Sequence, residues 1–514
     1  MRLVIGLDCS TTACKAIAFD PQGRAVAEGR ASLPLEMPQP AWHEQPAESW
    51  WRAAQQALLA VTRQIDPSCL AALAISIQRE TFVVTDAAGQ ALRPAMVWMD
   101  ERSRAILPRL AAEYGSERFH QEAGKPLSAN LVPGKLAWLR AHEPEVFAAT
   151  RRVLDVHAFL AGRLTGQYVT SWGCADPTGL FDMRSNQWNW TLIEALGLDP
   201  ACLPTAVAPG ELVATVSSAA AQLTGLPVGL PLIAGLGDGQ SAGLGVNITQ
   251  PGDAYLNLGT AVVSGSVSTR YLTDPAFRTH YSAARDTYFL ETVLLGGTYT
   301  ISWFIQRFSA PDSPPLTAGQ SPEDAMEEQA ARLPPGAQGL LLVPYWNSAM
   351  NPYWDPGASG VIVGWRGHHG LAHLYRAILE GIAYEQHLAT SGVEAATGQT
   401  IERYIAVGGG ARSPLWRQIL ADVTGKPILR ADVTEASALG AGILAAWGAG
   451  WYADLPAAAQ AMAPVPTHIC SPDPERHDSY QEIYQQVYRH LFPTLQPYLD
   501  RLTALAEKDR FFGN

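Results

Sequence analysis

GLDCSTTACKAIAFD, residues 6–20, runs from one apolar stretch through a short polar segment into another. The apolar stretches, residues 3–7 and 14–19, predict two buried strands. Between them stand the carboxylic acid of Asp8 and the hydroxyls of Thr11 and Thr12. Polar groups held between two buried strands sit on a rigid mount, so this turn is the first candidate site.

Beyond this hairpin the chain alternates between helical and strand patterns. Residues 48–65 have the apolar spacing of a helix, and residues 70–77 predict a further strand. Residues 253–268, DAYLNLGTAVVSGSVS, repeat the order of strand, glycine-threonine turn and strand. We therefore expect an α/β protein with two related halves, divided into domains at residues 1–247 and 248–514.

Three later segments complete the expected layout. Residues 308–339, rich in Pro, Gly, Ser and acids, predict a surface loop with a polar helix. Residues 437–451 form the longest apolar stretch, which is too short to span a membrane and predicts a buried helix. Residues 480–505 predict a last helix.

The composition argues against several classes of protein. Of the 514 residues, 47% are hydrophobic and 16% are charged, as in a folded globular chain. The net charge of −12 disfavours a nucleic-acid partner, because an acidic surface repels phosphate. The six cysteines form no C-x-x-C pair, so reduced thiols are expected rather than disulfides or zinc. The start of the chain lacks the pattern of a signal peptide, so we expect a cytoplasmic protein without a membrane partner.

The polar turn at residues 8–15 has the chemistry of a phosphate site. Backbone N–H groups converge in such a turn, Thr11 and Thr12 add donors, and Lys15 adds positive charge. Asp8 beside a phosphate site fits Mg²⁺, which prefers carboxylate and phosphate oxygens. The alternative is a polar hairpin in which Asp8 only accepts bonds from backbone N–H groups.

Two further motifs carry charged groups at predicted strand ends. Arg79 and Glu80 follow the strand at 70–77, and with Trp98 they are suited to holding a polyhydroxyl ligand. The alternative for this pair is a surface ion pair. Asp238 stands alone in GLGDGQS, where it is suited to act as a general base or, alternatively, to cap the following helix. The run GGGARS at 408–413 is suited to binding a phosphate or lying against a base.

Together and in this order, these motifs resemble the FGGY family of carbohydrate kinases. The resemblance extends from Gly6 to Gly442, and its most specific parts are residues 360–385 and 406–428. It implies two ribonuclease-H-like domains, of the kind found in actin and the heat-shock-70 ATPases, around a central cleft. It also implies ATP and Mg²⁺ as cofactors.

The resemblance implies a role for each matching position. Asp8 matches the magnesium-site aspartate, and Asp238 matches the catalytic base. The positions implied for ATP are Ser10, Thr11, Thr12, Lys15, Gly259, Thr260, Gly297, Gly409, Gly410 and Ala411. The positions implied for the sugar or polyol are Arg79, Glu80, Trp98, Asn130, Asp238 and Gly239.

Ser10 departs from the family pattern, which usually has glycine at this position. A serine fits only if its φ stays negative. Its hydroxyl would then either donate to phosphate or narrow the turn and weaken ATP binding.

The substrate is the finer question. QRET at residues 78–81 resembles glycerol kinase, but Asn130, Gly239 and Val263 are smaller than their counterparts there. A pocket with smaller walls favours a longer substrate, and the C-terminal half resembles xylulokinase. We expect phosphorylation of D-xylulose at its terminal hydroxyl, giving D-xylulose 5-phosphate. Glycerol or another short polyol is the alternative.

Non-catalytic relatives of the same superfamily are a different class. A sugar-sensing repressor carries a DNA-binding segment before its first strand, whereas this sequence reaches its first strand at residue 3. A filament protein has no use for the set Arg79, Glu80 and Trp98 beside a base-like acid. An enzyme is therefore expected, and a homodimer is compatible with the sequence.

Overall fold

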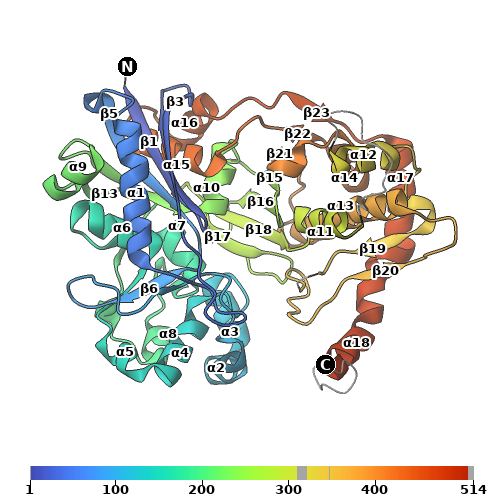
Figure 1. The fold of residues 1–514 in the computed structure, drawn as a ribbon, viewed down its shortest axis with the longest axis horizontal. Coiled ribbons are helices and arrows are strands. Elements are labelled where there is room, and N and C mark those ends of the chain that lie inside the picture. The colour runs from blue at the N-terminus through green and yellow to red at the C-terminus, as the bar shows by residue number, and fades with distance from the viewer. Residues whose placement is uncertain (1, 309–320, 347, 507–514) are drawn as a thin grey trace.

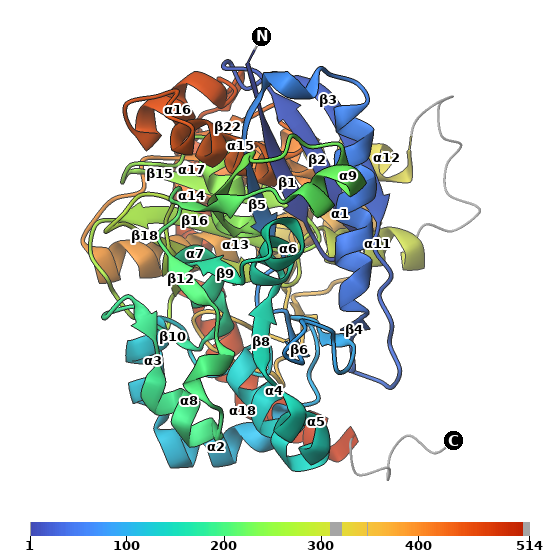
Figure 2. The same cartoon turned by 90° about the vertical axis from the view of Figure 1, so that its left-hand side faces the viewer.

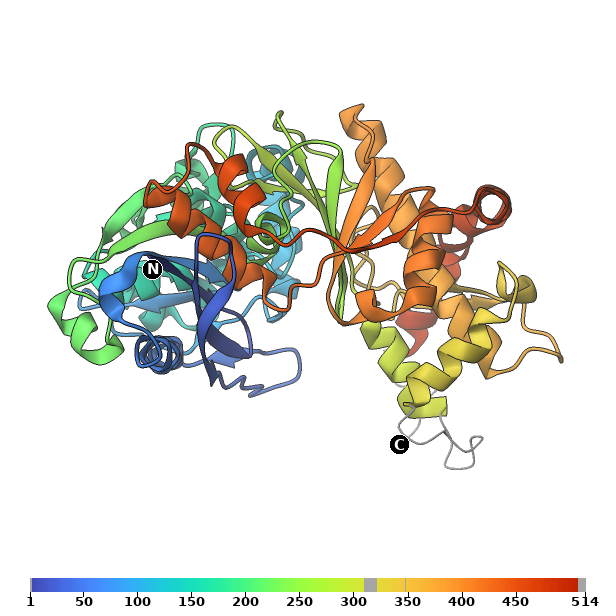
Figure 3. The ribbon, with the colours of Figure 1, turned by 90° about the horizontal axis from the view of Figure 1, so that it is seen from above.

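The computed structural model describes residues 2–308, 321–346 and 348–506. It has two lobes, each built around one large β-sheet, which meet at a narrow waist (Figure 1, Figure 3). Helices and strands alternate in both, so the expected α/β class is confirmed.

The first sheet has six strands in the order β13-β14-β5-β1-β2-β3. β1 pairs antiparallel with β2 and parallel with β5, and β5 pairs parallel with β14. GLDCSTTACKAIAFD thus forms most of the β1–β2 hairpin, as its apolar runs predict. The strands are β1 Leu3–Cys9, β2 Ala13–Phe19, β3 Ala25–Ser32, β5 Leu70–Ile77, β13 Leu212–Thr215 and β14 Pro231–Gly237.

The second sheet has seven strands in the order β17-β18-β16-β15-β21-β22-β23. Its antiparallel run β15-β16-β18 repeats β1-β2-β3, and its parallel strands β21 and β22 repeat β5 and β14. The predicted relation between the two halves is confirmed by this topology. The strands are β15 Asp253–Leu258, β16 Val262–Ser268, β17 Arg278–Tyr281, β18 Tyr288–Leu294, β21 Arg403–Val407, β22 Ile428–Arg430 and β23 His468–Cys470.

Alternate residues of β1 face different helices. Leu3, Ile5 and Leu7 pack with α1 (Ala47–Thr62) and α6 (Val156–Thr165) on one face. Val4 packs on the other face with helices from near the end of the chain. These are α15 (Ala436–Gly448) and α16 (Leu455–Met462), which lie over the lobe that holds the N-terminus (Figure 3).

α15 is the buried helix predicted at 437–451, and that prediction is confirmed. Its neighbour α10 (Asp238–Gly245) packs along it. The contact with β1 is very close, because a Cβ on Gly6 would lie 1.8 Å from the carbonyl oxygen of Ala438. Within the described residues, no helix combines the length and apolarity needed to cross a membrane.

Much of the segment between β5 and β14, including α2–α5 and α8, forms a region below the first sheet (Figure 2). It has its own apolar cluster and reaches the second lobe through Tyr281. Its strands are β6 Phe82–Thr85, β7 Ala95–Met96, β8 Arg152–Asp155, β9 Val169–Ser171, β10 Phe181–Asp182, β11 Gln187–Trp188 and β12 Thr205–Val207. Its helices are α2 Leu107–Tyr114, α3 Ser116–Ala123, α4 Val132–His142, α5 Pro144–Ala149, α7 Trp172–Ala175, α8 Trp190–Leu196 and α9 Ser218–Thr224.

Helices also cover the second sheet. Of the predicted loop and polar helix at 308–339, the helix is α12, and residues 309–320 lie outside the described part of the chain. The predicted last helix begins earlier than expected, at Pro474, and passes through a π-helical turn at Tyr484–Tyr488. The helices are α11 Thr298–Phe308, α12 Pro322–Ala331, α13 Leu371–Thr397, α14 Pro414–Thr424, α17 Pro474–Ile483 and α18 Arg489–Ala506.

Candidate active site

Three parallel strands of the first sheet end at the same edge. Asp8 lies at the end of β1, Arg79 follows β5, and Asp238 follows β14. Ligands of open α/β sheets bind at the carboxyl ends of strands, because polar side chains and helix N-termini gather there. Residues far apart in the sequence are thereby brought to one place.

A cavity of about 250 Å³ lies at this edge, between the two lobes. Six of the residues predicted for the site line it: Asp8, Ser10, Lys15, Arg79, Asp238 and Gly239. The rest of the lining comes from α10, from the second sheet and from the segment that leads into α15. Those residues are Ala242, Tyr255, Asn257, Val263, Val407, Gly408, Val433, Thr434, Glu435, Ala436 and Ser437.

The β1–β2 turn is closed by its own serine. Both the backbone nitrogen and the hydroxyl of Ser10 donate to the carbonyl of Ala13, over 3.0 and 2.9 Å. Ser10 is not among the residues with positive φ, so the serine is tolerated without strain. Lys15 lies on β2, just after the turn, and its Nζ is 2.6 Å from Glu435 Oε2. This ion pair joins the hairpin to the start of α15.

Thr11, Trp98 and Asn130 form a hydrogen-bonded series beside the cavity. The indole nitrogen of Trp98 donates to the hydroxyl of Thr11 at 2.9 Å. The amide of Asn130 donates to the carbonyl of Trp98 at 2.9 Å. None of the three lines the cavity, and neither do Thr12 and Glu80.

Asp8 is a buried carboxylate with an unused oxygen. Its Oδ1 is buried and has no hydrogen-bond partner. Burial, reinforced by the negative charge of Asp238, raises the pKa of Asp8 to about 7. A cation would satisfy both features, since it coordinates the unused oxygen and stabilises the ionised carboxylate. Among the described residues no cluster of three or more His, Cys, Asp or Glu forms a complete metal cage.

Asp238 has one occupied and one available oxygen. Its Oδ1 accepts from Arg79 Nε at 2.9 Å and from the backbone nitrogen of Gly239 at 2.8 Å. Its Oδ2 has no donor among the described residues, and the side chain is 39% exposed. Burial raises the pKa of Asp238, and the positive charge of Arg79 opposes that rise. The available oxygen can accept a proton from a group in the cavity.

Arg79 and Glu80 are ion-paired, but with the second lobe rather than with each other. Arg79 Nη1 lies 2.7 Å from Glu291 Oε2 on β18. Glu80 accepts from Arg278 Nη1 on β17 at 2.7 Å. Glu80 also has a φ of +59°, a sparsely populated conformation for glutamate that turns its side chain toward β17. The surface ion pair that the sequence offered as the alternative is therefore wrong, because both side chains are largely buried and pair with other residues.

Gly239 has a steric role beside these pairs. A Cβ at this position would lie 2.8 Å from Glu291 Oε2 and 3.0 Å from Arg79 Nη2. The missing side chain therefore admits Arg79 and Glu291 to this place. The space that the sequence assigns to a longer substrate at Gly239 is filled by protein.

The glycine turns of the second sheet follow β15 and β21, the strands that occupy the places of β1 and β5 in the first sheet. Gly259 and Thr260 connect β15 to β16, and their carbonyls accept from the backbone nitrogens of Thr298 and Tyr299. Gly297 packs against this turn so closely that a Cβ would lie 2.7 Å from the carbonyl oxygen of Gly259. The two turns are thereby held together.

Gly409, Gly410 and Ala411 follow β21 in a short 3₁₀ turn. The turn begins at Gly408, whose φ of +88° requires glycine. A Cβ on Gly409 would meet nothing within 4 Å, so this backbone faces open space. Such a surface is available to a flat ligand.

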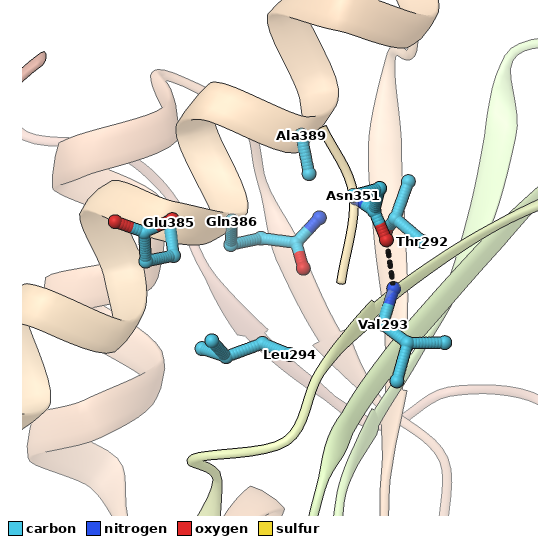
Figure 4. A pocket seen from close by; sticks show the side chains of 7 residues that line it. All are labelled: Thr292, Val293, Leu294, Asn351, Glu385, Gln386 and Ala389. Carbon is cyan, nitrogen blue, oxygen red and sulfur yellow. Dashed lines mark hydrogen bonds between the residues drawn. The ribbon is translucent and has the colours of Figure 1, made fainter. Parts of the chain in front are cut away.

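A second, water-sized cavity of about 10 Å³ lies between β18 and α13 (Figure 4). Asn351 crosses it to accept from the backbone nitrogen of Val293 at 2.7 Å. Glu385 of α13 also lines it, and burial raises the pKa of this carboxyl to about 7. Its size fits one water and excludes a sugar or a nucleotide.

Sequence reasoning missed the residues that the second lobe contributes. Glu291 is a lone acid in the otherwise apolar-rich strand YFLETVL, and such an acid is a usable signal. Arg278 and His280 alternate along β17, so they face the same side of the sheet. Asn257 and Glu435 carry no local signal, because only the fold brings them to the cavity.

Two family models match the chain in succession. The model for the FGGY family of carbohydrate kinases, N-terminal domain, matches residues 3–245. The model for the C-terminal domain of that family matches residues 254–449. The chain belongs to the FGGY family of carbohydrate kinases. It is therefore a carbohydrate kinase, and members of this family use ATP as the phosphate donor.

Several relatives of this FGGY kinase span nearly its whole length. It is 29% identical to xylulose kinase of Escherichia coli over 482 residues, which cover 93% of this chain and 96% of the relative. It is 25% identical to gluconokinase of Bacillus subtilis, with 87% and 88% covered. The solved xylulose kinase of Rhodospirillum rubrum superposes with a TM-score of 0.88 at 29% identity, with 97% and 100% covered. The FGGY resemblance of the sequence is confirmed.

Proposed function

We propose that this FGGY kinase transfers the γ-phosphoryl group of ATP to the terminal hydroxyl of D-xylulose. The observation that carries the proposal is Asp238, which begins α10, lines the cavity between the lobes and has an oxygen, Oδ2, without a donor among the described residues. A carboxylate in this position can take the proton of a sugar hydroxyl as that hydroxyl attacks the phosphoryl group.

The phosphates of ATP would bind to turns from both lobes. Ser10 and Lys15 line the cavity from the first sheet, and Gly408 lines it from the second. Backbone N–H groups and the ammonium of Lys15 neutralise charge on the phosphates. Gly259 and Gly409 do not line the cavity, but Gly408 does, so the adenosine would lie against the turn that Gly408 begins.

Asp8 would hold Mg²⁺. Its buried, unpaired Oδ1 fits a hard cation that takes carboxylate oxygen together with water and phosphate oxygens. When bound, the ion neutralises charge on the β- and γ-phosphates.

The choice of D-xylulose rests on relatives and on one wall of the cavity. Two relatives that are each 29% identical to this chain are named xylulose kinases. Val263 lines the cavity and leaves more room than a bulky aromatic side chain would. Gly239 adds no room, because Arg79 and Glu291 fill the place beside it.

The catalytic assignment is tested with Asp238→Asn. We expect kcat with D-xylulose to fall by about 100-fold or more, because the amide cannot accept the proton. Asp253→Asn is the matched control, since it removes a carboxylate at the opposite end of β15 that pairs with Arg403 on the surface. An Asp238→Asn enzyme whose kcat stays within about tenfold of wild type would contradict the assignment.

The substrate is tested by measuring kcat/KM for ATP-dependent phosphorylation of D-xylulose, D-ribulose, L-ribulose, glycerol, erythritol and gluconate. We expect D-xylulose to have the highest value. A preference for glycerol would establish the short-polyol alternative, and a preference for gluconate would place the enzyme with the gluconokinase relatives.

A further inference from the structure

A series of alternating charges runs from Glu80 of the first lobe through the second lobe and back to Asp238. Its members in order are Glu80, Arg278, Glu291, Arg79 and Asp238. Each member is paired with the next, through distances of 2.7 Å at Glu80–Arg278 and Arg79–Glu291 and 2.9 Å at Arg79–Asp238. Only Asp238, at the end of the series, is substantially exposed.

Glu291 holds the centre of this series. Its side chain is fully buried, and each carboxylate oxygen pairs with a different arginine, Oε2 with Arg79 and Oε1 with Arg278. Glu291 and Arg278 stand directly opposite each other on β18 and β17, so the strand pairing fixes their register.

The contacts of Arg79 fix the orientation of its guanidinium group. Nε meets Asp238, and Nη1 meets Glu291 and lies 3.3 Å from His280 Nε2. His280 is in turn held by Asp176, which lies 2.6 Å from its Nδ1. The guanidinium is planar, so its hydrogen bonds to Asp238 through Nε and to Glu291 through Nη1 together prevent it from rotating.

We propose that Glu291 is a positioning residue for phosphoryl transfer, which together with Arg278 fixes Arg79 against Asp238 and so orients the carboxylate that faces the substrate. This inference rests on the proposed function of Asp238 as the base. Glu291 itself touches no substrate position, because it is buried and does not line the cavity.

Stability alone does not account for this arrangement. A buried ion pair adds little net stability, because desolvation of the charges offsets their attraction. Gly239 is glycine where a Cβ would lie 2.8 Å from Glu291 Oε2 and 3.0 Å from Arg79 Nη2. The sequence next to the base is thus adapted to this pair, as a positioning role requires.

The test compares Glu291→Gln with the wild-type enzyme in steady-state kinetics. The amide keeps the shape of the side chain but loses the charge that anchors Arg79. We expect kcat to fall by about 100-fold, the size of effect that a misplaced catalytic group produces, with the KM for ATP within about threefold of wild type. Glu291→Asp keeps the charge, so its kcat should be at least about tenfold higher than that of Glu291→Gln.

Glu380→Gln is the matched control. Glu380 is an equally buried acid that pairs with Arg376 at 2.7 Å on α13, outside the series. Both variants lose a buried pair, so both melting temperatures should fall. When kcat is calculated per mole of folded enzyme, only that of Glu291→Gln should fall. Similar kcat values for the two variants would overturn the proposal.

Arg278→Lys keeps the inference testable if Glu291→Gln does not fold. Lysine keeps the charge, but its single ammonium cannot bridge Glu80 and Glu291 as the guanidinium does. We expect kcat to fall by about tenfold, and an unchanged kcat would overturn the inference. The inference alone fails if Asp238→Asn is inactive while the Glu291 and Arg278 variants keep their kcat. An active Asp238→Asn enzyme would overturn the proposed function as well.

Discussion

At the scale of single residues, Ser10 shows how a side chain can close a turn. Its hydroxyl donates to Ala13 of the same turn, so it is occupied by the protein rather than free for phosphate. Its φ is not positive, which answers how a serine fits where the family usually has glycine.

Ser10→Gly should therefore affect stability rather than nucleotide binding. The variant loses the hydrogen bond to Ala13, and its unfolded chain is more flexible. Together these changes should lower the free energy of unfolding by about 1–2 kcal/mol. The KM for ATP should stay at the wild-type value. Urea denaturation and steady-state kinetics check the two expectations, and a large change in this KM would show that the hydroxyl or its Cβ acts on the phosphates.

The sequence predicted the residues that sit at strand ends better than those that reach them from elsewhere. Asp8 and Asp238 follow apolar strands, and parallel strands bring such positions together, so both could be found from local pattern. The partners of Arg79 and Glu80 could not be found in this way. Glu291 and Arg278 lie about 200 residues further along the chain, and only the meeting of the lobes brings them close.

At the scale of elements, the most informative contact is that of α15 with β1. The helix is apolar around nearly its whole circumference, and glycines let it approach its neighbours. Gly6 lies against Ala438, and Gly440 lies against Ser241 of α10 with a Cβ-to-oxygen distance of 1.8 Å. The burial of this helix could be predicted from its composition. Its location could not, because a helix without a polar face does not indicate which sheet it covers.

Gly6→Ala tests this packing. The added Cβ would lie 1.8 Å from a backbone oxygen of α15, which cannot move without displacing the helix. We expect the free energy of unfolding to fall by about 3 kcal/mol or more. Gly367→Ala is the control, since a Cβ there meets nothing within 4 Å. Chemical denaturation should show a large loss only for Gly6→Ala, and equal stabilities would contradict the close packing of α15.

At the scale of the whole molecule, the order of the chain does not follow the division into lobes. α15 and α16 come after β22 of the second sheet, yet they complete the apolar face of the first. The predicted division at residue 247 therefore separates the two sheets. It also separates the first sheet from α15 and α16, the helices that cover one of its two faces. We propose that the first folding unit consists of residues 1–247 together with 433–463.

This proposal predicts the behaviour of fragments. Residues 1–247 alone should aggregate, because the face around Val4 and Phe19 is exposed. Joining 433–463 to their end through a short flexible linker should give a monomer that unfolds cooperatively. The linker can be short, since Gly245 lies against Ala436. Size-exclusion chromatography and thermal unfolding test this, and a stable monomer of 1–247 alone would contradict it.

The late position of α15 also affects how the protein is made. The strands of the first sheet leave the ribosome early, but the helix that covers their second face begins about 200 residues after β14 ends. At bacterial or eukaryotic rates of synthesis this interval is roughly 10–40 s. During that time the nascent chain presents an uncovered apolar sheet, which is a surface for chaperones that act during translation. The first lobe to be synthesised is thus among the last parts of the molecule to be finished.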